Sequence, residues 1–391
     1  MSVLARIELE EVRRALRERA LDGWLLYDFH GMNPIAARVL GIGGMATRRL
    51  FVLLPADGAP VAVAHRIELQ PLEGFPGEIR AYAAWEELHH NLGEVVRGRK
   101  LAMEVSPDDG VPYLDRVPMG VVQLIERLGG HVESSAELVT LFAARWSPRE
   151  REDHFAAAEA LAEIARITLT EVVVEVGSAR EHAVQQRVLE RMERAGLTTD
   201  HPPIVAFGPN AANPHYEPCE GDDAVLQENA VVLLDLWGGR SLETVFADQT
   251  WMAFAGSTPP DEVVTVWETV RDARDAVIER LRAGLAAGEA VTGAVLDVAA
   301  RDLIAERGYG EAFVHRTGHS IDIELHGCGP HLDSYETNDV RVLLPGIGFS
   351  VEPGVYLAGR FGVRSEVNVV MEDDGATVTP ASPQSTLIVR G

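Results

Sequence analysis

The sequence is organised around the run Ala312-Phe-Val-His-Arg-Thr-Gly-His-Ser-Ile-Asp-Ile-Glu-Leu-His-Gly-Cys-Gly-Pro-His331. This run holds four of the 13 histidines of the chain, His315, His319, His326 and His331. Because imidazole is a common metal ligand and carries protons near neutral pH, the run is a candidate functional site. Which of its histidines belong to that site depends on carboxylates that lie before and after it in the sequence.

Length and composition favour a two-domain globular protein. The chain has 391 residues, more than one core usually serves, and its 46% hydrophobic and 24% charged residues are ordinary values. A net charge of −25 argues against a nucleic-acid or anionic membrane partner, since either needs a basic patch. The sequence predicts no signal peptide, no membrane span and, from the isolated Cys219 and Cys328, no disulfide framework. We therefore expect a cytoplasmic protein.

Residues 1–146 are predicted to form a small α/β domain. Helical periodicity marks residues 8–19 and 117–128, and short apolar runs predict strands at 23–29, 49–54, 60–64 and 100–105. The turn Pro55-Ala-Asp-Gly58 predicts a hairpin between two of these strands. The histidines of this domain lack carboxylates at ligand spacing and are expected to be structural or on the surface: His30, His65, His89 and His90.

Residues 147–391 are predicted to form a second domain of two similar halves. Ser147-Pro-Arg-Glu150 is a capping box with proline at the first helical position, so a helix over 149–174 begins there. A second box, Ser178-Ala-Arg-Glu181, predicts a helix that ends at Gly196. Strands are expected at 203–207, 230–237 and 244–254, and the plan repeats with helices at 259–281 and 289–307 and strands at 348–356 and 362–371. This order predicts a pseudo-twofold domain with its site between the halves.

Four carboxylates stand in or beside the predicted strands of this domain. Asp235 and Asp248 each interrupt an apolar strand, and a hairpin would place them side by side. Glu352 precedes a Pro-Gly turn that fixes its direction, and Glu366 lies in the following strand. An unpaired buried carboxylate costs several kcal/mol or takes up a proton. Any one of them alone could be a capped or salt-bridged strand residue, but the four together indicate a shared cation.

With His319 added, these residues form an oxygen-rich ligand set. Such a set suits hard divalent ions, Mn²⁺ first and less selectively Co²⁺, Fe²⁺ or Zn²⁺. Because four carboxylates carry more negative charge than one dication balances, two metal ions are expected. Carboxylates can bridge ions about 3.5–4 Å apart, and such a pair can hold and deprotonate a bridging water at neutral pH. The set therefore predicts hydrolysis by a hydroxide that bridges two metals.

The chain resembles the dinuclear metallopeptidases of the pita-bread fold, which include methionine aminopeptidase, aminopeptidase P and prolidase. The resemblance covers residues 147–391, and residues 1–146 resemble the creatinase-type N-terminal domain that accompanies Xaa-Pro peptidases. It implies an α/β (α+β) protein with a pseudo-twofold pita-bread catalytic domain, and a homodimer. It rests on five residues in one order, Asp235, Asp248, His319, Glu352 and Glu366, and on the motifs Gly318-His319, Leu344-Pro-Gly346, Glu352-Pro-Gly354 and Arg364-Ser-Glu366.

The resemblance also implies roles for individual residues. Asp235 would chelate one metal, His319 would bind the other, and two residues would bridge both, namely Asp248 and Glu366. Glu352 would be a ligand that also handles the proton of the nucleophilic water. Three histidines match substrate-facing positions and would hold the scissile carbonyl, the proline side of the substrate and the tetrahedral intermediate: His215, His315 and His326. His331 matches no such position and is expected to be structural or on the surface.

The sequence departs from the family pattern around the later histidines. The spacing between the two aspartates is longer, so we expect a lengthened hairpin turn. Gly-His-Gly-x-Gly becomes Gly318-His-Ser-Ile-Asp322, and the acid that commonly follows the later histidine is Gly327. Asp322 and the loop 328–339 are therefore expected to alter the pocket rim. The zinc motif HExxH is not an alternative, because His315-Arg-Thr-Gly-His319 lacks its glutamate.

These features predict a metal-dependent Xaa-Pro dipeptidase that hydrolyses the bond before proline in a small peptide. The first alternative is an aminopeptidase P that removes the first residue of longer Xaa-Pro peptides. The second, of another class, is a metal-free creatinase-like enzyme or a binding protein, although relatives of that kind lose metal ligands. Arg364 is the best cation for the substrate carboxylate, and orienting Glu366 is an equally open role for it.

Overall fold

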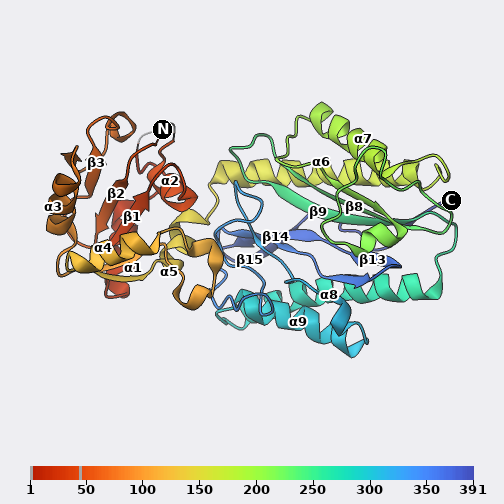
Figure 1. Cartoon of the computed structure of the whole chain (residues 1–391). Coiled ribbons are helices and arrows are strands. Elements are labelled where there is room, and N and C mark those ends of the chain that lie inside the picture. The colour runs from red at the N-terminus through yellow and green to blue at the C-terminus, as the bar shows by residue number, and fades with distance from the viewer. Residues whose placement is uncertain (1–2, 44–45) are drawn as a thin grey trace. The chain divides into compact units, whose positions relative to one another are not determined.

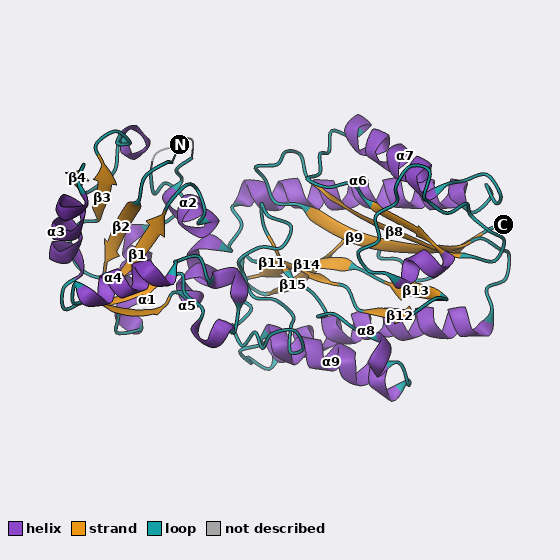
Figure 2. Ribbon diagram, viewed as in Figure 1, coloured by secondary structure: helices purple, strands orange, loops and turns teal. Residues whose placement is uncertain are grey.

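The computed structural model describes residues 3–43 and 46–391. The chain divides into two compact units, Met1–Ala144 and Arg145–Gly391, so the division falls two residues before the predicted one at 146/147. Figures 1 and 2 show the elements of both units. Among the residues described, no helix combines the length and the apolar character that a membrane crossing requires.

The first unit is built on a six-stranded sheet of order β4-β3-β2-β1-β5-β6. The predicted hairpin is confirmed, since β2 and β3 pair antiparallel. The two edge strands, β4 and β6, escape prediction because half or more of their side chains are not buried and their sequences lack an apolar run. The elements are α1 (Leu9–Glu18), β1 (Gly23–Asp28), α2 (Pro34–Leu40), β2 (Leu50–Pro55), β3 (Val61–His65), β4 (Glu78–Tyr82), α3 (Trp85–Val96), β5 (Lys100–Met103), α4 (Met119–Arg127), β6 (His131–Ser134) and α5 (Ala136–Leu138).

The second unit repeats one plan, two helices followed by a sheet. In Figure 1, α6 and α7 lie on one side of the strands and α8 and α9 lie on the other. The first half contains α6 (Pro148–Val172), α7 (Glu181–Arg194), β7 (Ile204–Phe207), β8 (Val231–Gly238) and β9 (Ala247–Phe254), and the second contains α8 (Asp261–Ala286), α9 (Gly293–Glu306), β10 (Ser320–Ile321), β11 (Gly348–Val351), β12 (Gly354–Leu357), β13 (Phe361–Arg364), β14 (Val367–Glu372) and β15 (Gly375–Thr379). The C-terminal β16 (Ile388–Val389) joins the first sheet, whose order is β16-β9-β8-β7, while the second has the order β10-β11-β14-β15.

A local sequence signal sets the start of α6, but the similar signal before α7 does not. Ser147 and Glu150 form the predicted capping box, in which Glu150 N donates to Ser147 Oγ at 3.2 Å and Ser147 N donates to Glu150 Oε2 at 2.6 Å. The second predicted box is wrong: the Ser178 hydroxyl donates to Glu175 O, and α7 begins only at Glu181. Glu181 is fully buried, and its carboxylate instead accepts a hydrogen bond from Phe207 N, 26 residues later in the sequence.

The two predicted strands at 348–356 and 362–371 are each broken in two. Pro353 follows Glu352 at the first break, between β11 and β12, and Glu366 lies at the second break, between β13 and β14. The inner segments form a hairpin of their own, in which Gly354 pairs with Arg364. The break lets β11 and β14 continue in the main sheet while β12 and β13 leave it. Both predicted glutamate ligands therefore lie at points where the chain changes sheets.

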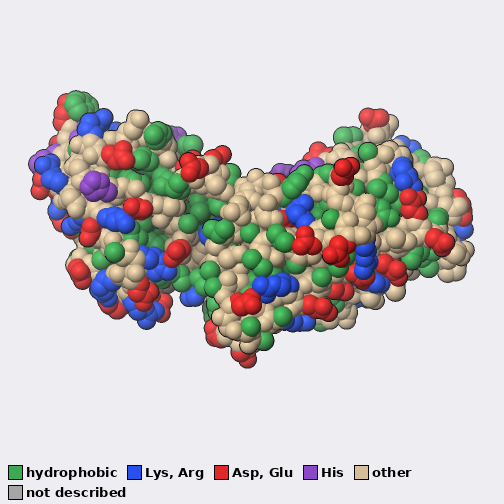
Figure 3. Space-filling model, turned by 90° about the horizontal axis from the view of Figure 1, so that it is seen from below, with side chains coloured by type: hydrophobic (Ala, Val, Ile, Leu, Met, Phe, Trp, Pro, Cys, Tyr) green, Lys and Arg blue, Asp and Glu red, His purple; other side chains and the backbone are tan. Residues whose placement is uncertain are grey.

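The surface of the second unit that carries α8 and α9 mixes acidic side chains with arginines (Figure 3). Exposed ion pairs join these helices to their surroundings, such as Arg280 to Glu289 at 2.8 Å and Arg307 to Asp272 at 2.7 Å. Pairs of this kind contribute little to stability because water and salt screen them. On this face the charge is interspersed, as in an ordinary solvated surface.

Candidate metal centre

Asp235 and Asp248 lie on neighbouring strands of the first sheet and point to the same side. In the register of β8 and β9, Asp235 pairs with Thr250 and Trp237 pairs with Asp248. The two aspartates are therefore diagonal neighbours on one face, offset by two residues. The predicted hairpin is correct, and its longer turn shifts the partners without separating the carboxylates. Both side chains are buried, with 6% and 4% of their surface exposed.

The backbone of Asp248 is fixed by a side chain from the second sheet. Asn368 on β14 accepts from Asp248 N at 2.9 Å and donates to Asp248 O at 2.7 Å. This pair of hydrogen bonds ties β9 to β14, so it aligns the two sheets where their carboxylates meet. The sequence contained a signal for Asn368, a polar residue inside an apolar strand, but no sign of its partner.

His319 presents one ring nitrogen to the carboxylates. Its Nδ1 lies 3.1 Å from the carbonyl oxygen of Ser320, which can only accept, so Nδ1 donates there and Nε2 is the nitrogen that faces the site. Nε2 lies 3.4 Å from Asp248 Oδ2 and 3.3 Å from Glu352 Oε1. Gly318 lets the chain pass close to β11, because a Cβ there would lie 2.0 Å from Ser350 O.

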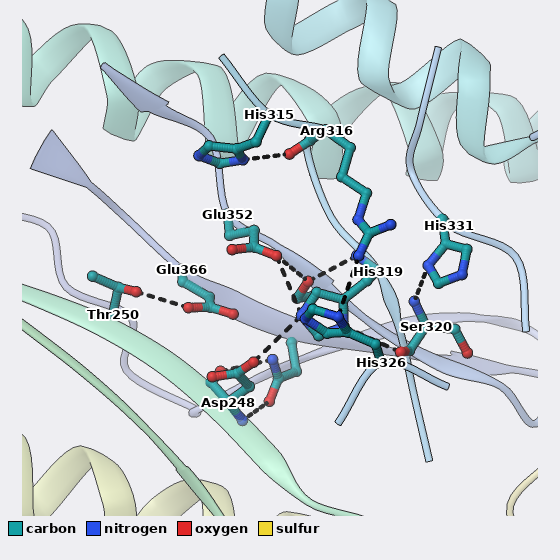
Figure 4. A network of polar contacts seen from close by, with 12 residues as sticks. Asp248, Thr250, His315, Arg316, His319, Ser320, His326, His331, Glu352 and Glu366 are labelled. Atoms are coloured by element: carbon teal, nitrogen blue, oxygen red, sulfur yellow. Dashed lines mark hydrogen bonds and ion pairs between the residues drawn. The ribbon is translucent and has the colours of Figure 1, made fainter. Parts of the chain in front are cut away.

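Figure 4 shows four of the candidate ligands, Asp248, His319, Glu352 and Glu366, pointing toward one another. Asp248, His319 and Glu366 each offer a ligand atom within 4.8 Å of the others. Asp235 and Glu352 line the same cavity, which has a volume of about 440 Å³. The structure thus brings all five predicted ligands into one pocket, and the candidate ligand atoms of three of them are close enough together to bind one ion.

The site has the chemistry expected of a cation-binding centre. Asp248 Oδ1 and Glu366 Oε1 are buried and have no hydrogen-bond partner, which is costly for carboxylate oxygens. Burial, with the charge of Glu352, raises the pKa of Asp248 even though His319 acts in the opposite direction, and burial with the charge of Asp248 raises the pKa of Glu366 well above its ordinary value. Divalent cations would supply the missing partners for these oxygens, so the residues present fit bound metal.

Arg364 is already engaged by the site itself. It forms a buried ion pair with Asp235, and its Nε donates to Thr250 Oγ1 at 2.8 Å. The Thr250 hydroxyl in turn lies 2.8 Å from Glu366 Oε2. Burial and the charges of Asp248 and Glu352 still raise the pKa of Asp235 to about 7, even though Arg364 acts in the opposite direction. Arg364 therefore orients Asp235 directly and reaches Glu366 only through Thr250.

The other predicted histidines divide into two groups. His215 and His326 line the cavity, and the ring of His326 lies 4.2 Å from that of His319, centroid to centroid. His315 is not among the lining residues, and its two ring nitrogens contact Arg316 O at 2.7 Å and Tyr356 Oη at 2.8 Å. His331 is buried and accepts from Ser320 N at 3.2 Å.

Glu181, at the start of α7, organises the loop that carries His215. Its carboxylate accepts from Phe207 N at 2.6 Å, from the Tyr216 hydroxyl at 2.7 Å and from Ala224 N at 2.8 Å. No sequence signal predicts this role, since a glutamate at the start of a helix has the pattern of a capping residue. Trp237 also lines the cavity, two residues after Asp235 on the same strand face, a placement that strand periodicity could have indicated.

Comparisons with known proteins identify the family of this chain. The sequence profile described as metallopeptidase family M24 matches residues 153–373. "Probable dipeptidase PepE" of Mycobacterium tuberculosis is 29% identical over 348 residues, which cover 88% of this chain and 86% of that protein. The Xaa-Pro dipeptidase of Lactobacillus helveticus is 38% identical over 172 residues, 44% of this chain and 42% of that protein.

Solved structures show the same fold. Dipeptidase PepE from Mycobacterium ulcerans superposes with a TM-score of 0.77 at 23% identity, covering 98% of this chain and 97% of the other. The prolidase of Thermococcus sibiricus gives a TM-score of 0.70 at 23% identity, over 100% and 99% of the two chains. The pita-bread architecture expected from the sequence is thereby confirmed. The chain belongs to metallopeptidase family M24.

Proposed function

We propose that this protein is an Xaa-Pro dipeptidase that hydrolyses the peptide bond before proline with two divalent metal ions. The observation that carries the proposal is the convergence of Asp235, Asp248, His319, Glu352 and Glu366 in one pocket, where two buried carboxylate oxygens lack hydrogen-bond partners. Family M24 membership and relatives named as dipeptidases support it. We propose Mn²⁺ as the metal, with Co²⁺, Fe²⁺ or Zn²⁺ as other candidates.

The five residues would hold the metal ions. When bound, such ions act as Lewis acids on the peptide carbonyl and make a water nucleophilic at neutral pH. Asp235 is paired with Arg364, while Asp248 and Glu366 each have a buried oxygen without a hydrogen-bond partner. These contacts support the terminal role of the first and the bridging role of the other two.

Glu352 is suited to receive the proton of the attacking water. Burial raises the pKa of Glu352, but the positive groups around it, with His319 and Arg364 foremost, outweigh burial and hold that pKa below its ordinary value. Its Oε1 is steadied by the Ser350 hydroxyl at 3.0 Å. Glu352 would therefore be ionised when substrate binds, accept the proton at a carboxylate oxygen and return it to the leaving proline nitrogen.

The two histidines that line the cavity would contact the substrate. The positive charge of His319, together with burial, lowers the pKa of His326 to about 2. The His326 ring is therefore neutral and can donate one N–H. Donated to the scissile carbonyl oxygen, this N–H would stabilise the negative charge that develops there. His215 would act from the opposite loop. His315 would support the pocket through Tyr356, because it contacts that hydroxyl and does not line the cavity.

One observation favours the alternative of an aminopeptidase P. A dipeptidase must bind the free carboxylate of proline, yet Arg364 is the one arginine or lysine among the described lining residues, and Asp235 already engages it. If no cation meets that carboxylate, a peptide that continues beyond proline would bind equally well. In the dipeptidase the exposed histidines of the rim, His201 and His215, would bind the carboxylate by hydrogen bonds.

The test is to assay the Mn²⁺-loaded protein with Ala-Pro, Ala-Pro-Gly and Ala-Ala. A dipeptidase specific for proline gives a kcat/KM for Ala-Pro at least tenfold above those for the other two peptides. Preference for Ala-Pro-Gly would identify an aminopeptidase, and preference for Ala-Ala a dipeptidase of different specificity. Cleavage of none, with metal bound, would favour a creatinase-like enzyme or a binding protein. We further propose that the protein is a cytoplasmic homodimer. Sedimentation equilibrium would test whether two copies assemble.

A further inference from the structure

The loop 322–328 carries two of the lining residues of the pocket, Leu325 and His326. It leaves the second sheet after the short strand β10 and returns where Gly327 N donates to Ser320 O at 2.7 Å. The side chains of Leu325 and His326 therefore reach the pocket from a segment outside any helix or strand. Figure 4 shows the His326 ring beside His319. Something must hold this segment in place if His326 is to act on substrate.

Asp322 supplies that anchor from within the loop. It is 4% exposed, and its two carboxylate oxygens accept from two amides on opposite limbs of the loop. Oδ1 accepts from Glu324 N at 2.8 Å and Oδ2 accepts from Cys328 N at 3.1 Å. One side chain thus joins the beginning and the end of the segment that carries His326. Charge-assisted hydrogen bonds of this kind are stronger than those between neutral groups.

Gly327 packs directly against the carboxylate of Asp322. A Cβ at position 327 would lie 2.6 Å from Asp322 Oδ2 and 2.8 Å from its Cγ. The carboxylate fills the volume that a side chain at 327 would occupy, so any larger residue there must displace it. Since Gly327 has an ordinary backbone conformation, space is what excludes a side chain here: Asp322 is the nearest group, and Ser320 Oγ would lie 3.0 Å from the same Cβ. Asp322 and Gly327, the two departures of this loop from the family pattern, are therefore linked: the carboxylate of one fills the space beside the other.

We propose that Asp322 is a positioning residue, whose carboxylate closes the loop 322–328 and thereby holds His326 and Leu325 against the metal-binding pocket. Asp322 does not itself line that pocket, so it acts on the substrate only through these two residues. The inference deepens the proposed peptidase function and rests on it for the activity readout. It concerns Asp322, which is not one of the proposed metal ligands.

The test compares variants of the full-length, Mn²⁺-loaded protein with Ala-Pro as substrate. Asp322→Ala is expected to lower kcat/KM at least tenfold while metal content stays at the wild-type level, and Asp322→Asn, which keeps one acceptor oxygen, to fall between. Gly327→Ala is expected to cause a similar loss by displacing the carboxylate. In Asp322→Gly/Gly327→Ala the second change should add no loss beyond Asp322→Gly, because the atom it displaced is gone.

Asp28 offers a matched control from the other unit. It is also buried, and it accepts from two backbone amides, Gly31 N and Asn33 N, both at 3.0 Å. Asp28→Ala reproduces the loss of a buried anchoring carboxylate, so it measures the effect of general destabilisation on activity. We expect it to keep kcat/KM within about twofold of wild type. A loss in Asp28→Ala as large as in Asp322→Ala would contradict a specific role for Asp322.

Hydrogen exchange separates this inference from the proposed function. In Asp322→Ala the amides of Glu324 and Cys328 should exchange at least tenfold faster, whether or not the protein cleaves peptides. If the wild type cleaves no peptide, the proposed function fails while the exchange result still decides whether Asp322 anchors the loop. Unchanged exchange in Asp322→Ala, kcat/KM within twofold of wild type, or multiplying losses in the double variant would each overturn the inference.

Discussion

Replacing Asp248 by asparagine should abolish the stabilisation of the protein by Mn²⁺ without harming the metal-free fold. The side chain of Asp248 has a buried oxygen, Oδ1, that lacks a partner, and burial beside other carboxylates raises its pKa. Its backbone is held separately by the Asn368 amide, at 2.9 and 2.7 Å. The substitution therefore removes a ligand and a buried charge but leaves the link between the two sheets.

The size of the effect follows from binding linkage. A ligand present at 100 times its dissociation constant stabilises the folded state by about 2.7 kcal/mol. In a unit of this size, Arg145–Gly391, each kcal/mol shifts the melting temperature by about 2–4 °C. Mn²⁺ should therefore raise the melting temperature of the wild type by about 5–11 °C, and that of Asp248→Asn by less than about 1 °C.

The metal-free variant provides the second half of the prediction. Because asparagine removes a carboxylate that is buried among carboxylates, metal-free Asp248→Asn should melt at or above the temperature of metal-free wild type at pH 7. The assay is thermal unfolding by circular dichroism with EDTA and with Mn²⁺, together with metal analysis of the dialysed protein. Asp222→Asn, at an exposed aspartate, is the control and should respond to Mn²⁺ as wild type does. A normal Mn²⁺ shift and full metal content in Asp248→Asn would refute the ligand assignment.

Two other perturbations test different parts of the structure. Burial lowers the pKa of His154 to about 4, so below pH 6.5 the unfolded chain takes up a proton that the folded chain does not. The contribution of His154 to the free energy of unfolding is complete above pH 6.5 and falls toward pH 4. Between pH 7 and 5, urea unfolding of the wild type should show a loss of about 2 kcal/mol in the free energy of unfolding that His154→Gln lacks. Equal losses in both proteins would contradict this. Gly318→Ala would place its Cβ 2.0 Å from Ser350 O. It should displace His319 and lower bound Mn²⁺ at least tenfold by metal analysis, and full metal content would exclude that constraint.

Two of the proposed ligands could be predicted from sequence because each breaks a local rule. Asp235 and Asp248 interrupt strands that are otherwise apolar, and burial of such a residue requires compensation whatever the tertiary structure is. The capping box at Ser147 and the repeated order of elements likewise depend on neighbours within a few residues. Signals of this range survive without knowledge of the fold.

Contacts between distant segments could not be predicted in the same way. Arg364 and Asp235 are 129 residues apart, and only the register of the folded sheets shows that they pair. Glu181 has the sequence pattern of a helix cap, but tertiary contacts draw its carboxylate to Phe207, Tyr216 and Ala224. The same holds for His315, a loop residue whose ring contacts Tyr356 in β12. In each case a long-range partner overrides the local pattern.

The most direct test of the account is a crystal structure grown with Mn²⁺, with anomalous diffraction data collected at the manganese absorption edge. We predict two anomalous peaks about 3.5–4 Å apart, with Asp248 and Glu366 in contact with both ions. Asp235 should contact one ion and His319 the other. A single peak would contradict the dinuclear centre, and peaks away from these residues would contradict the site itself.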